Sequence, residues 1–261
     1  MEWGRIKTMF IYLFAVLNLI LIAAYFYLDY QNKSERYEEK QAIINSIKND
    51  NIIVENFTIN KEKLARVSST IKRFSIDTLP KSQQYSYSLE SEGNSEKLEI
   101  KFNTPLTNVN NENFKESIVN FITTAVGKSD EYVFEEYSIS DKKITYRQAV
   151  AGLPIYNNSR ASLIFDVDNK GDVVSATKTA LVNTKLGEEQ TIVPYSQVVQ
   201  KLYHENMIAK NSKVDVDLGY YTYVSDVENQ VLIPTWEIRV MTEEKEKTYY
   251  VDAYNMKIVN N

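Results

Sequence analysis

The sequence predicts an α+β protein with one N-terminal transmembrane helix, followed by a body of antiparallel β-meanders and helices. Three observations predict this: an uncharged apolar run near the N-terminus, recurrent alternation of apolar and polar residues, and two amphipathic helical segments. The chain has 261 residues, of which 43% are hydrophobic and 25% charged, so it can bury a core. Its formal net charge of -5 argues against nucleic acid as a partner.

The composition excludes several kinds of chemistry. The chain has no cysteine and a single histidine, His204, which excludes disulfides, thiolate nucleophiles and metal sites built from cysteines or several histidines. Adjacent helical residues do not face each other, so Glu205 does not pair with His204. We therefore expect a protein that binds no metal or other cofactor and is not an enzyme. A hydrolase that joins two carboxylates from distant segments remains an alternative.

Residues 9–28 form an apolar run without a charge, MFIYLFAVLNLILIAAYFYL. A helix rises about 1.5 Å per residue, so a run of this length spans a hydrocarbon core of about 30 Å. A cleaved signal peptide is the alternative, but its apolar region is shorter and ends at small residues, whereas this run continues past Ala24 to Leu28. The run therefore predicts one retained transmembrane helix.

The charges beside this run predict its orientation. Arg5 and Lys7 lie in the short tail of residues 1–8, whereas charges of both signs follow the run. Because positively charged flanks stay on the cytoplasmic side, we expect the tail in the cytoplasm and the rest of the chain outside. The prediction is a single-pass cell-membrane protein with an extracellular C-terminal body.

Asn18 is a polar residue near the middle of the apolar run, where an unpaired amide is unfavourable. At helical spacing it shares a stripe with Ala15 and Ile22, and the small Ala15 would let another helix approach closely. Two interpretations stay open. Either Ala15, Asn18 and Ile22 contact a partner helix, or the amide is satisfied by water or by the carbonyl four residues earlier.

The segments after the anchor have mixed patterns. Residues 29–50 are rich in helix formers and predict a stalk helix or linker. Residues 51–108 form the N-terminal part of the exported body, in which we expect strands over 52–59 and 84–103 and a helix near 61–72.

Two helix-plus-meander units follow, over residues 109–190 and 191–261. In the first, residues 111–126 place apolar side chains on one helical face, and in the second, Pro194 opens a helix. Strands are expected after each helix, at 132–140, 143–151, 160–167 and 173–182 in the first unit, and at 214–224, 231–240, 246–252 and 256–259 in the second.

Residues 166–171 superficially resemble a calcium-binding loop. However, Lys170 occupies a position that would need an oxygen ligand, and a cation there opposes metal binding. The segment is therefore predicted to be a hairpin turn.

Aromatic side chains are concentrated in the second unit, where Tyr220, Trp236 and Tyr250 each lie in an expected strand. Alternation places Trp236 and Ile238 on one face of their strand and Glu237 on the other. Large rings on a meander commonly fill the space beneath a packed helix, so we interpret the three as a structural aromatic motif. A peptide-binding groove is the alternative.

Several motifs in a fixed order resemble those of a known family. They are Trp3-Gly4-Arg5-x-Lys7-Thr8, Leu17-Asn18, Gln148 with Gly152-Leu153-Pro154-Ile155-Tyr156-Asn157, Leu218-Gly219-Tyr220-Tyr221, Pro234-Thr235-Trp236-Glu237-Ile238 and Tyr249-Tyr250-Val251-Asp252-Ala253. Together they are similar to the YycI members of the YycH/YycI family of Gram-positive regulators. The last three also resemble the PepSY-like pattern, a helix followed by a meander.

The resemblance implies a non-enzymatic accessory protein that modulates a WalK-type sensor histidine kinase of the WalK/WalR (YycG/YycF) two-component system, which controls cell-wall metabolism. Its implied partners are this kinase, a YycH-like sister protein and the membrane, contacted through the transmembrane helix and the exported body. It also implies a PepSY-like tandem for the body and supplies no functional side chains. The alternative is a PepSY-like extracytoplasmic binding module that inhibits or senses a cell-wall peptidase.

Overall fold

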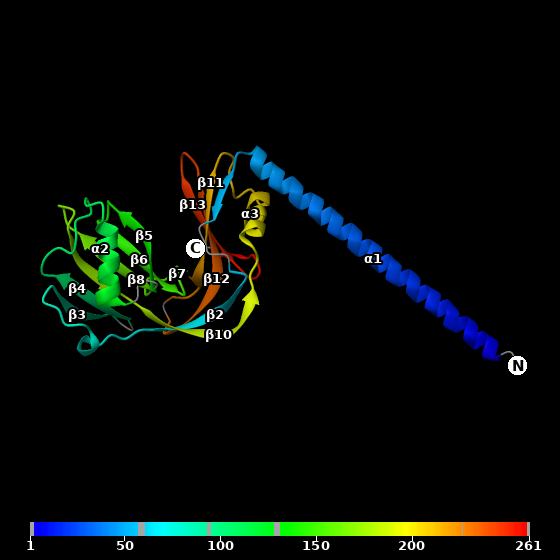
Figure 1. Cartoon of the computed structure of the whole chain (residues 1–261), viewed down its shortest axis with the longest axis horizontal. Coiled ribbons are helices and arrows are strands. Elements are labelled where there is room, and N and C mark those ends of the chain that lie inside the picture. Colours follow the sequence, from blue (N-terminus) through cyan, green and yellow to red (C-terminus); the bar gives the residue numbers. More distant parts are fainter. Residues whose placement is uncertain (1–2, 57–60, 93–94, 128–130, 226, 260–261) are drawn as a thin grey trace. The chain divides into compact units, whose positions relative to one another are not determined.

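The computed structural model describes residues 3–56, 61–92, 95–127, 131–225 and 227–259 (Figure 1). The chain divides into two compact units, the first made of residues 1–53 and 200–212 and the second of residues 54–199 and 213–261. One long apolar helix begins the chain, and a mostly β-sheet body with a few short helices follows. The predicted α+β class is therefore confirmed.

The first of these two compact units consists mainly of helix α1, Trp3–Asn49, which has 47 residues. Its segment Ile6–Tyr27 is long enough and apolar enough to cross a membrane once, and none of that segment is buried within the protein. The helix then continues without a break to Asn49. The expected stalk helix is thus a direct extension of the apolar helix.

Just beyond α1, the chain is fastened to the other segment of the same unit, residues 200–212. The hydroxyl of Tyr203 donates a hydrogen bond to Oδ2 of Asp50 at 2.8 Å. The ammonium of Lys210 lies 3.0 Å from Oδ1 of Asp50, and the N–H of Asn211 donates to the Asp50 carbonyl at 2.9 Å. Asp50 therefore joins the end of the stalk to this segment through both its side chain and its backbone.

The described part of the body contains fourteen strands in one continuous hydrogen-bonded network. Its main path runs β10-β2-β12-β11-β7-β6-β8-β9-β4-β3, with β13 beside β12, β14 beside β13, β5 beside β6 and β1 beside β11. The strands are β1 Ile53–Asn56, β2 Lys63–Ile71, β3 Tyr85–Glu92, β4 Ser95–Phe102, β5 Tyr132–Ser138, β6 Lys143–Val150, β7 Leu153–Tyr156, β8 Ser162–Val167, β9 Val173–Lys178, β10 Leu181–Thr191, β11 Lys213–Thr222, β12 Asn229–Met241, β13 Glu246–Asp252 and β14 Ile258–Val259.

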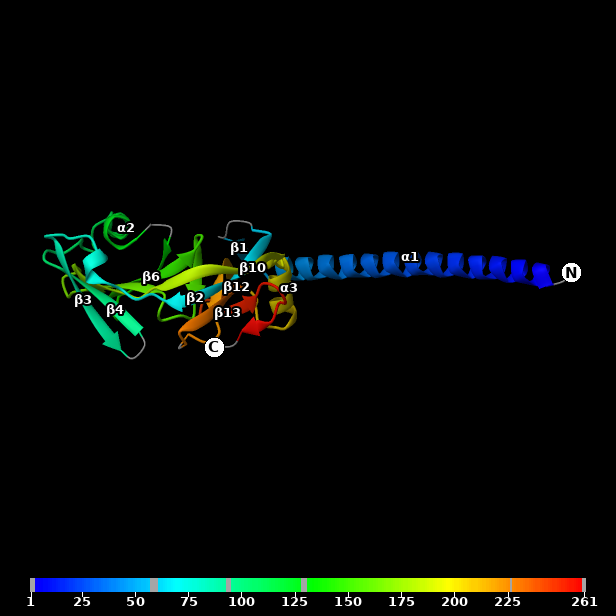
Figure 2. The same cartoon turned by 90° about the horizontal axis from the view of Figure 1, so that it is seen from below.

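Helix α2, Phe114–Phe121, shares one hydrophobic core with the strands β4, β6, β8 and β9. Figure 2 shows α2 close to β4 and β6. The helix continues as a single π-helical turn, Ile122–Val126. Ile118 and Phe121 are buried, and the Phe121 ring meets Phe102 and Phe165 edge-on at centroid distances of 5.0 and 6.1 Å. The apolar face expected over residues 111–126 forms this core.

Strand β7 connects the α2-covered strands to the C-terminal meander of β11, β12 and β13. It pairs antiparallel with β6 and parallel with β11. Ala151 and Gly152 form the tight turn between β6 and β7, with φ values of 51° and 80°. All four residues of β7 are buried, so it lacks the alternation by which a half-exposed strand is recognised. This strand was not expected from the sequence.

The prediction of a helix near residues 61–72 is wrong, because residues 63–71 of this segment form strand β2. Its sequence KLARVSSTI contains the β-branched residues Val67, Thr70 and Ile71, which favour a strand. The strand pairs with β10 on one side and β12 on the other. Hydrogen bonding to a neighbouring strand on each edge stabilises this segment as a strand more than its weak local preference stabilises a helix.

The hairpin turn expected at residues 166–171 is confirmed. Oδ1 of Asp168 accepts the N–H groups of Lys170 at 2.8 Å and Asp172 at 2.9 Å. Gly171 has a φ of 86°, a conformation that glycine adopts without strain. The carboxylate thus organises the turn that joins β8 to β9.

Candidate functional site

A row of polar side chains lies on the face of β12 opposite Trp236. The strand register places Asp217 of β11 beside Glu237 of β12, and Glu237 beside Tyr250 of β13. Successive residues of a strand point to opposite faces, so this row is on the other face from Trp236. Arg239, two residues along β12, shares the face of Glu237.

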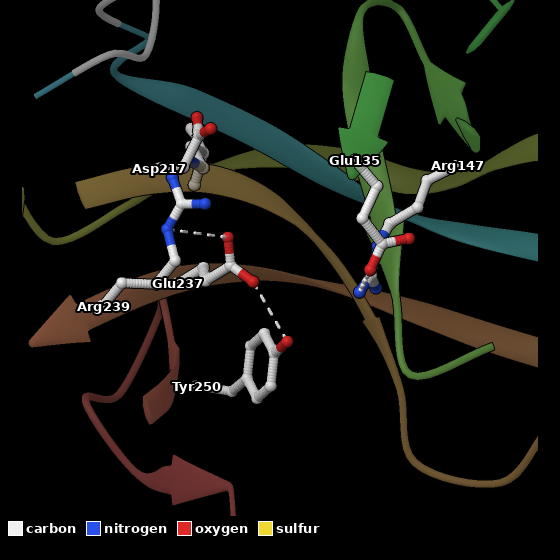
Figure 3. A network of polar contacts seen from close by, with 7 residues as sticks. Glu135, Arg147, Asp217, Glu237, Arg239 and Tyr250 are labelled. Atoms are coloured by element: carbon white, nitrogen blue, oxygen red, sulfur yellow. Dashed lines mark hydrogen bonds and ion pairs between the residues drawn. The ribbon is translucent and has the colours of Figure 1, made fainter. Parts of the chain in front are cut away.

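Strands β5, β6 and β7 supply the rest of the site. Glu135 of β5 and Arg147 of β6 form an ion pair, and the Arg147 guanidinium lies 5.5 Å from the ring centroid of Tyr156 of β7. These side chains and the polar row line a cavity of about 470 Å³. Figure 3 shows the Glu135–Arg147 pair on one side of Tyr250 and the group of Asp217, Glu237 and Arg239 on the other.

Glu237 is the most constrained carboxylate of the cavity. It is 9% exposed, and its Oε1 accepts a hydrogen bond from the Tyr250 hydroxyl at 3.0 Å (Figure 3). Nε of Arg239 lies 3.9 Å from its Oε2. Burial raises the pKa of Glu237, whereas Arg239 and the Tyr250 hydroxyl act in the opposite direction. Burial also raises the pKa of Tyr250, so its hydroxyl stays protonated and donates.

Three tyrosine rings stand together beside this carboxylate. The Tyr250 ring lies between Tyr156 and Tyr221, at centroid distances of 5.2 and 5.1 Å. The amide of Asn157 donates a hydrogen bond to the Tyr221 hydroxyl at 2.9 Å. The site therefore combines an aromatic cluster with charged groups.

The three residues of the expected aromatic motif occupy different places. Trp236 is 4% exposed, and its indole N–H donates to the Val193 carbonyl at 2.9 Å while its ring lies 6.1 Å from that of Tyr195. Tyr220 is buried as well, and its hydroxyl donates to the Ala65 carbonyl at 3.2 Å. Tyr250 is the member of the three that lines the cavity.

The predicted transmembrane stripe lies on α1, where Ala15 and Ile22 are exposed on either side of Asn18. The Asn18 amide donates a hydrogen bond to the Phe14 carbonyl at 2.8 Å. This is the contact expected if the amide is satisfied four residues earlier. An asparagine amide has two N–H donors and one acceptor oxygen, so the bond to Phe14 uses one donor only.

The cavity has the chemistry of a binding site for a charged ligand. Among the residues that the structure describes, no group of three or more His, Cys, Asp or Glu side chains could hold a metal ion, and His204 is exposed at the end of α3, Tyr195–His204. Asp217 and Glu237 are neighbours on one wall of the cavity. Hydrolysis by a carboxylate pair needs the two groups on either side of the bond to be cleaved.

Sequence reasoning missed Glu135, Arg147, Asp217 and Arg239 as site residues. One local signal was present, because Glu237 and Arg239 place charges at alternate positions in the otherwise apolar second half of β12. The signal becomes informative only once β5 and β6 are known to approach the same face.

Two solved structures are similar to this chain, whereas no curated protein matches it. A crystal structure of an uncharacterized protein from Eubacterium rectale is similar with 12% identity and a TM-score of 0.48, covering 81% of this chain and 91% of that one. The C-terminal domain of Bacillus megaterium YpeB is similar with 11% identity and a TM-score of 0.40, covering 85% of this chain and 96% of that domain.

A family model described as YycI protein matches residues 31–254, which include most of the stalk and nearly all of the β-sheet body. The resemblance noted from the sequence motifs is therefore confirmed. The chain belongs to the YycI family, a family of regulatory accessory proteins, not enzymes, of the YycG/WalK two-component system.

Proposed function

We propose that this chain is a single-pass membrane accessory protein that modulates a WalK-type sensor histidine kinase, and thereby cell-wall metabolism, by direct protein–protein contact. The observation that carries the proposal is the match of residues 31–254 to the YycI family. The apolar segment Ile6–Tyr27 supports it, because it would place the protein in the same membrane as a sensor kinase.

The proposed orientation has the N-terminus in the cytoplasm and the body outside the membrane. Arg5 and Lys7 precede the apolar segment, and positively charged flanks are retained on the cytoplasmic side. In this orientation α1 and the body contact the membrane and exported parts of the kinase and of a YycH-like sister protein.

One proposed contact is the stripe of Ala15, Asn18 and Ile22 on α1. The exposed Ala15 leaves room for a neighbouring backbone. Asn18 keeps one N–H and its carbonyl oxygen beyond the bond to Phe14, and these can bond a polar group of a partner helix.

A second proposed element is the Asp50 junction at the end of the stalk. Tyr203 and Lys210 both bind the Asp50 carboxylate, so a change in residues 200–212 would act directly on the end of α1. Contacts made by the exported body would in this way influence the helix that meets the kinase.

The test is co-purification from detergent of the kinase and the sister protein with the tagged full-length chain. Asn18→Leu removes the amide, and since transmembrane hydrogen bonds contribute about 0.6 to 2 kcal/mol, partner association should weaken roughly 3-fold to 30-fold. Ala15→Leu should weaken it by steric exclusion. Leu13→Ala, outside the stripe, is the matched control and should retain the partners at the wild-type level.

Two results would contradict the proposal. If Asn18→Leu and Ala15→Leu both retain the partners while an exchanged body abolishes capture, the transmembrane contact is wrong. If the full-length chain captures a cell-wall peptidase and not the kinase, the function itself is wrong and the alternative of a peptidase-binding module replaces it.

A further inference from the structure

Strand β10 has one unpaired edge in the described part of the chain. It is the end strand of the main path of the sheet, where β2 is its one neighbouring strand. The N–H of Lys72, just after β2, donates to the Ala180 carbonyl at 2.9 Å, so the groups of Ala180 point toward β2. Alternate residues of a strand direct their N–H and C=O groups to the same edge. Leu181, Asn183 and Lys185 therefore direct theirs away from β2.

Gln148 of β6 occupies the start of this open edge in the manner of a neighbouring strand. Its side-chain N–H donates to the Leu181 carbonyl, and its side-chain oxygen accepts the Leu181 N–H, both at 2.8 Å. Such a reciprocal pair of bonds joins two antiparallel strands. Farther along the edge, Asn183 and Lys185 offer the same pattern of groups, and no strand lies beside them among the described residues.

A groove runs beside this open edge. It consists of two adjoining hollows of about 340 and 390 Å³, which share Asn183 of β10 and Val150 and Ala151 at the end of β6 as lining residues. Val182 and Leu186 point to the other face of β10 and are 50% and 46% exposed. Both the backbone edge and the apolar side chains of β10 are thus accessible to an added strand.

The groove is rich in positive charge, although the whole chain has a net charge of -5. Five lysines line it against two glutamates. The lysines are Lys61, Lys63, Lys72, Lys178 and Lys185, and the glutamates are Glu131 and Glu189. One glutamate is matched by a lysine of the groove, since the Lys185 ammonium lies 3.1 Å from the Glu189 carboxylate. The excess of lysines favours an acidic ligand.

We propose that β10 binds an extended acidic segment of another protein, which adds to the sheet as a further strand along Asn183 and Lys185. Residues directly opposite each other in an antiparallel pair place their side chains on the same face. Segment residues that bond the backbone of Asn183 and Lys185 therefore direct their side chains to the face on which Lys63 and Lys185 line the groove. Acidic residues fit there, and the apolar residues between them fit beside Val182.

A second copy of this chain is a poorer occupant of the edge. Two copies joined edge to edge would bring two lysine-lined grooves together. Lysines on an exposed edge strand oppose such pairing of identical edges. The same charges attract an acidic segment, so they select a different partner over self-association.

Fluorescence polarisation with the full-length protein in detergent tests the proposal. The probe is the fluorescein-labelled peptide Val-Glu-Val-Glu-Val with an amidated C-terminus. One control has glutamine at both glutamates, and a second has both glutamates N-methylated. We expect each control to bind about 10-fold more weakly, because the first lacks the charge and the second lacks the N–H groups that bond β10. Methylation of the middle valine, whose N–H points away from β10, should leave the affinity unchanged.

Variants of the protein separate the backbone contact from the charge. Lys185→Pro removes an N–H on the open edge, where proline is tolerated, and should bind the probe about 10-fold more weakly than Lys185→Gln, which keeps the N–H. Replacing both Lys63 and Lys72 by glutamine should weaken binding and reduce its dependence on salt. Lys101→Gln, which removes an exposed lysine on β4, is the matched control and should bind like wild type. The melting temperature of each variant verifies that it is folded.

The proposal is overturned if the probe does not bind at concentrations on the order of 1 mM. It is also overturned if the glutamine peptide or the peptide with N-methylated glutamates binds as tightly as the probe. If the purified protein is a dimer that Lys185→Pro converts to a monomer, the edge belongs to a second copy and the proposal is wrong. No kinase takes part in these measurements, so their failure is distinguishable from a failure of the proposed function.

Discussion

Lys178 shows how a single buried cation is accommodated in the core beneath α2. Its side chain is 5% exposed, its ammonium donates to the Val126 carbonyl at 2.7 Å, and the ring centroids of Phe74 and Tyr132 each lie 5.6 Å away. These groups are weaker partners for an ammonium than a carboxylate or water. Burial, assisted by the nearby Lys72, lowers the pKa of Lys178 to about 8.

Lys178→Met should therefore stabilise the protein at pH 7. The folded pKa of Lys178 is below its unfolded value, so the charged form opposes folding by up to about 3 kcal/mol below pH 8, and this penalty disappears as the pH rises toward the unfolded pKa. The variant keeps the volume without the charge and should gain about 2 kcal/mol at pH 7. Urea unfolding of both proteins should show the difference shrinking between pH 8 and 10. A difference independent of pH would contradict this account.

Trp236→Ala should act through folding. Truncating a packed tryptophan costs about 3 to 5 kcal/mol, and here the Val193 carbonyl also loses its donor. The variant should unfold at a lower denaturant concentration and accumulate poorly in cells. Trp3, which is 70% exposed, is the matched control, and Trp3→Ala should leave the unfolding of the body unchanged. A stable and abundant Trp236→Ala protein that no longer modulates signalling would instead favour the interpretation of the aromatic residues as a peptide-binding groove.

At the level of elements, the body depends on how closely β7 approaches β11. A Cβ added to Gly219 would overlap the Pro154 carbonyl and the ring of Tyr156. The two strands pair in parallel at Tyr220 and Ile155, directly beside this glycine. The absence of a side chain at Gly219 thus leaves room beside β11 for both the backbone of β7 and the ring of Tyr156, which lines the cavity.

Gly219→Ala should consequently separate β7 from β11. Overpacking against backbone typically costs about 1 to 3 kcal/mol, and the rigid carbonyl of Pro154 predicts the upper end of this range. Chemical unfolding should show the loss, and hydrogen exchange should be faster in β7. Gly127→Ala is the control, because the nearest atom there is the end of the flexible Glu131 side chain. Equal stability of the two variants would refute the close-approach explanation.

Asp50→Asn tests the junction at the end of α1. The hydrogen bonds from Lys210 and Tyr203 lower the pKa of Asp50, so its contribution is present above the ordinary aspartate pKa and is lost as the pH falls through the lowered value. In the variant, amide exchange in the last turn of α1 and in residues 200–212 should accelerate, whereas the exposed Asp77→Asn should change neither. Unchanged exchange in Asp50→Asn would show that the backbone contacts hold the junction alone.

At the level of the whole molecule, the chain passes between its two units three times. Residues 200–212 belong with α1, whereas the segments on both sides of them belong to the body. The units are therefore covalently joined at three points, and the anchor is part of the folded protein as well as a membrane attachment.

The proposed orientation predicts that protease added to intact spheroplasts digests the body and leaves a fragment containing the tail and the apolar helix. The proposed orientation rests on the positively charged flank, so replacing both Arg5 and Lys7 by glutamate should increase the fraction of protected body. Immunoblotting with tags at both ends measures the fragments, and a cytoplasmic protein serves as the control for intact cells. A mature N-terminus that begins after Ala24 would show instead that the helix is a cleaved signal.

Local patterns were sufficient for much of the fold. The apolar run, the amphipathic segment 111–126, the turn at 166–171 and most strands of the meanders follow from periodicity and turn chemistry, because each is determined by neighbours in the sequence. The family was also readable from ordered motifs. Tertiary structure decided the rest. It made residues 63–71 a strand through pairing on both edges, and it brought the cavity together from strands far apart in the chain, since no local period records which distant faces will meet.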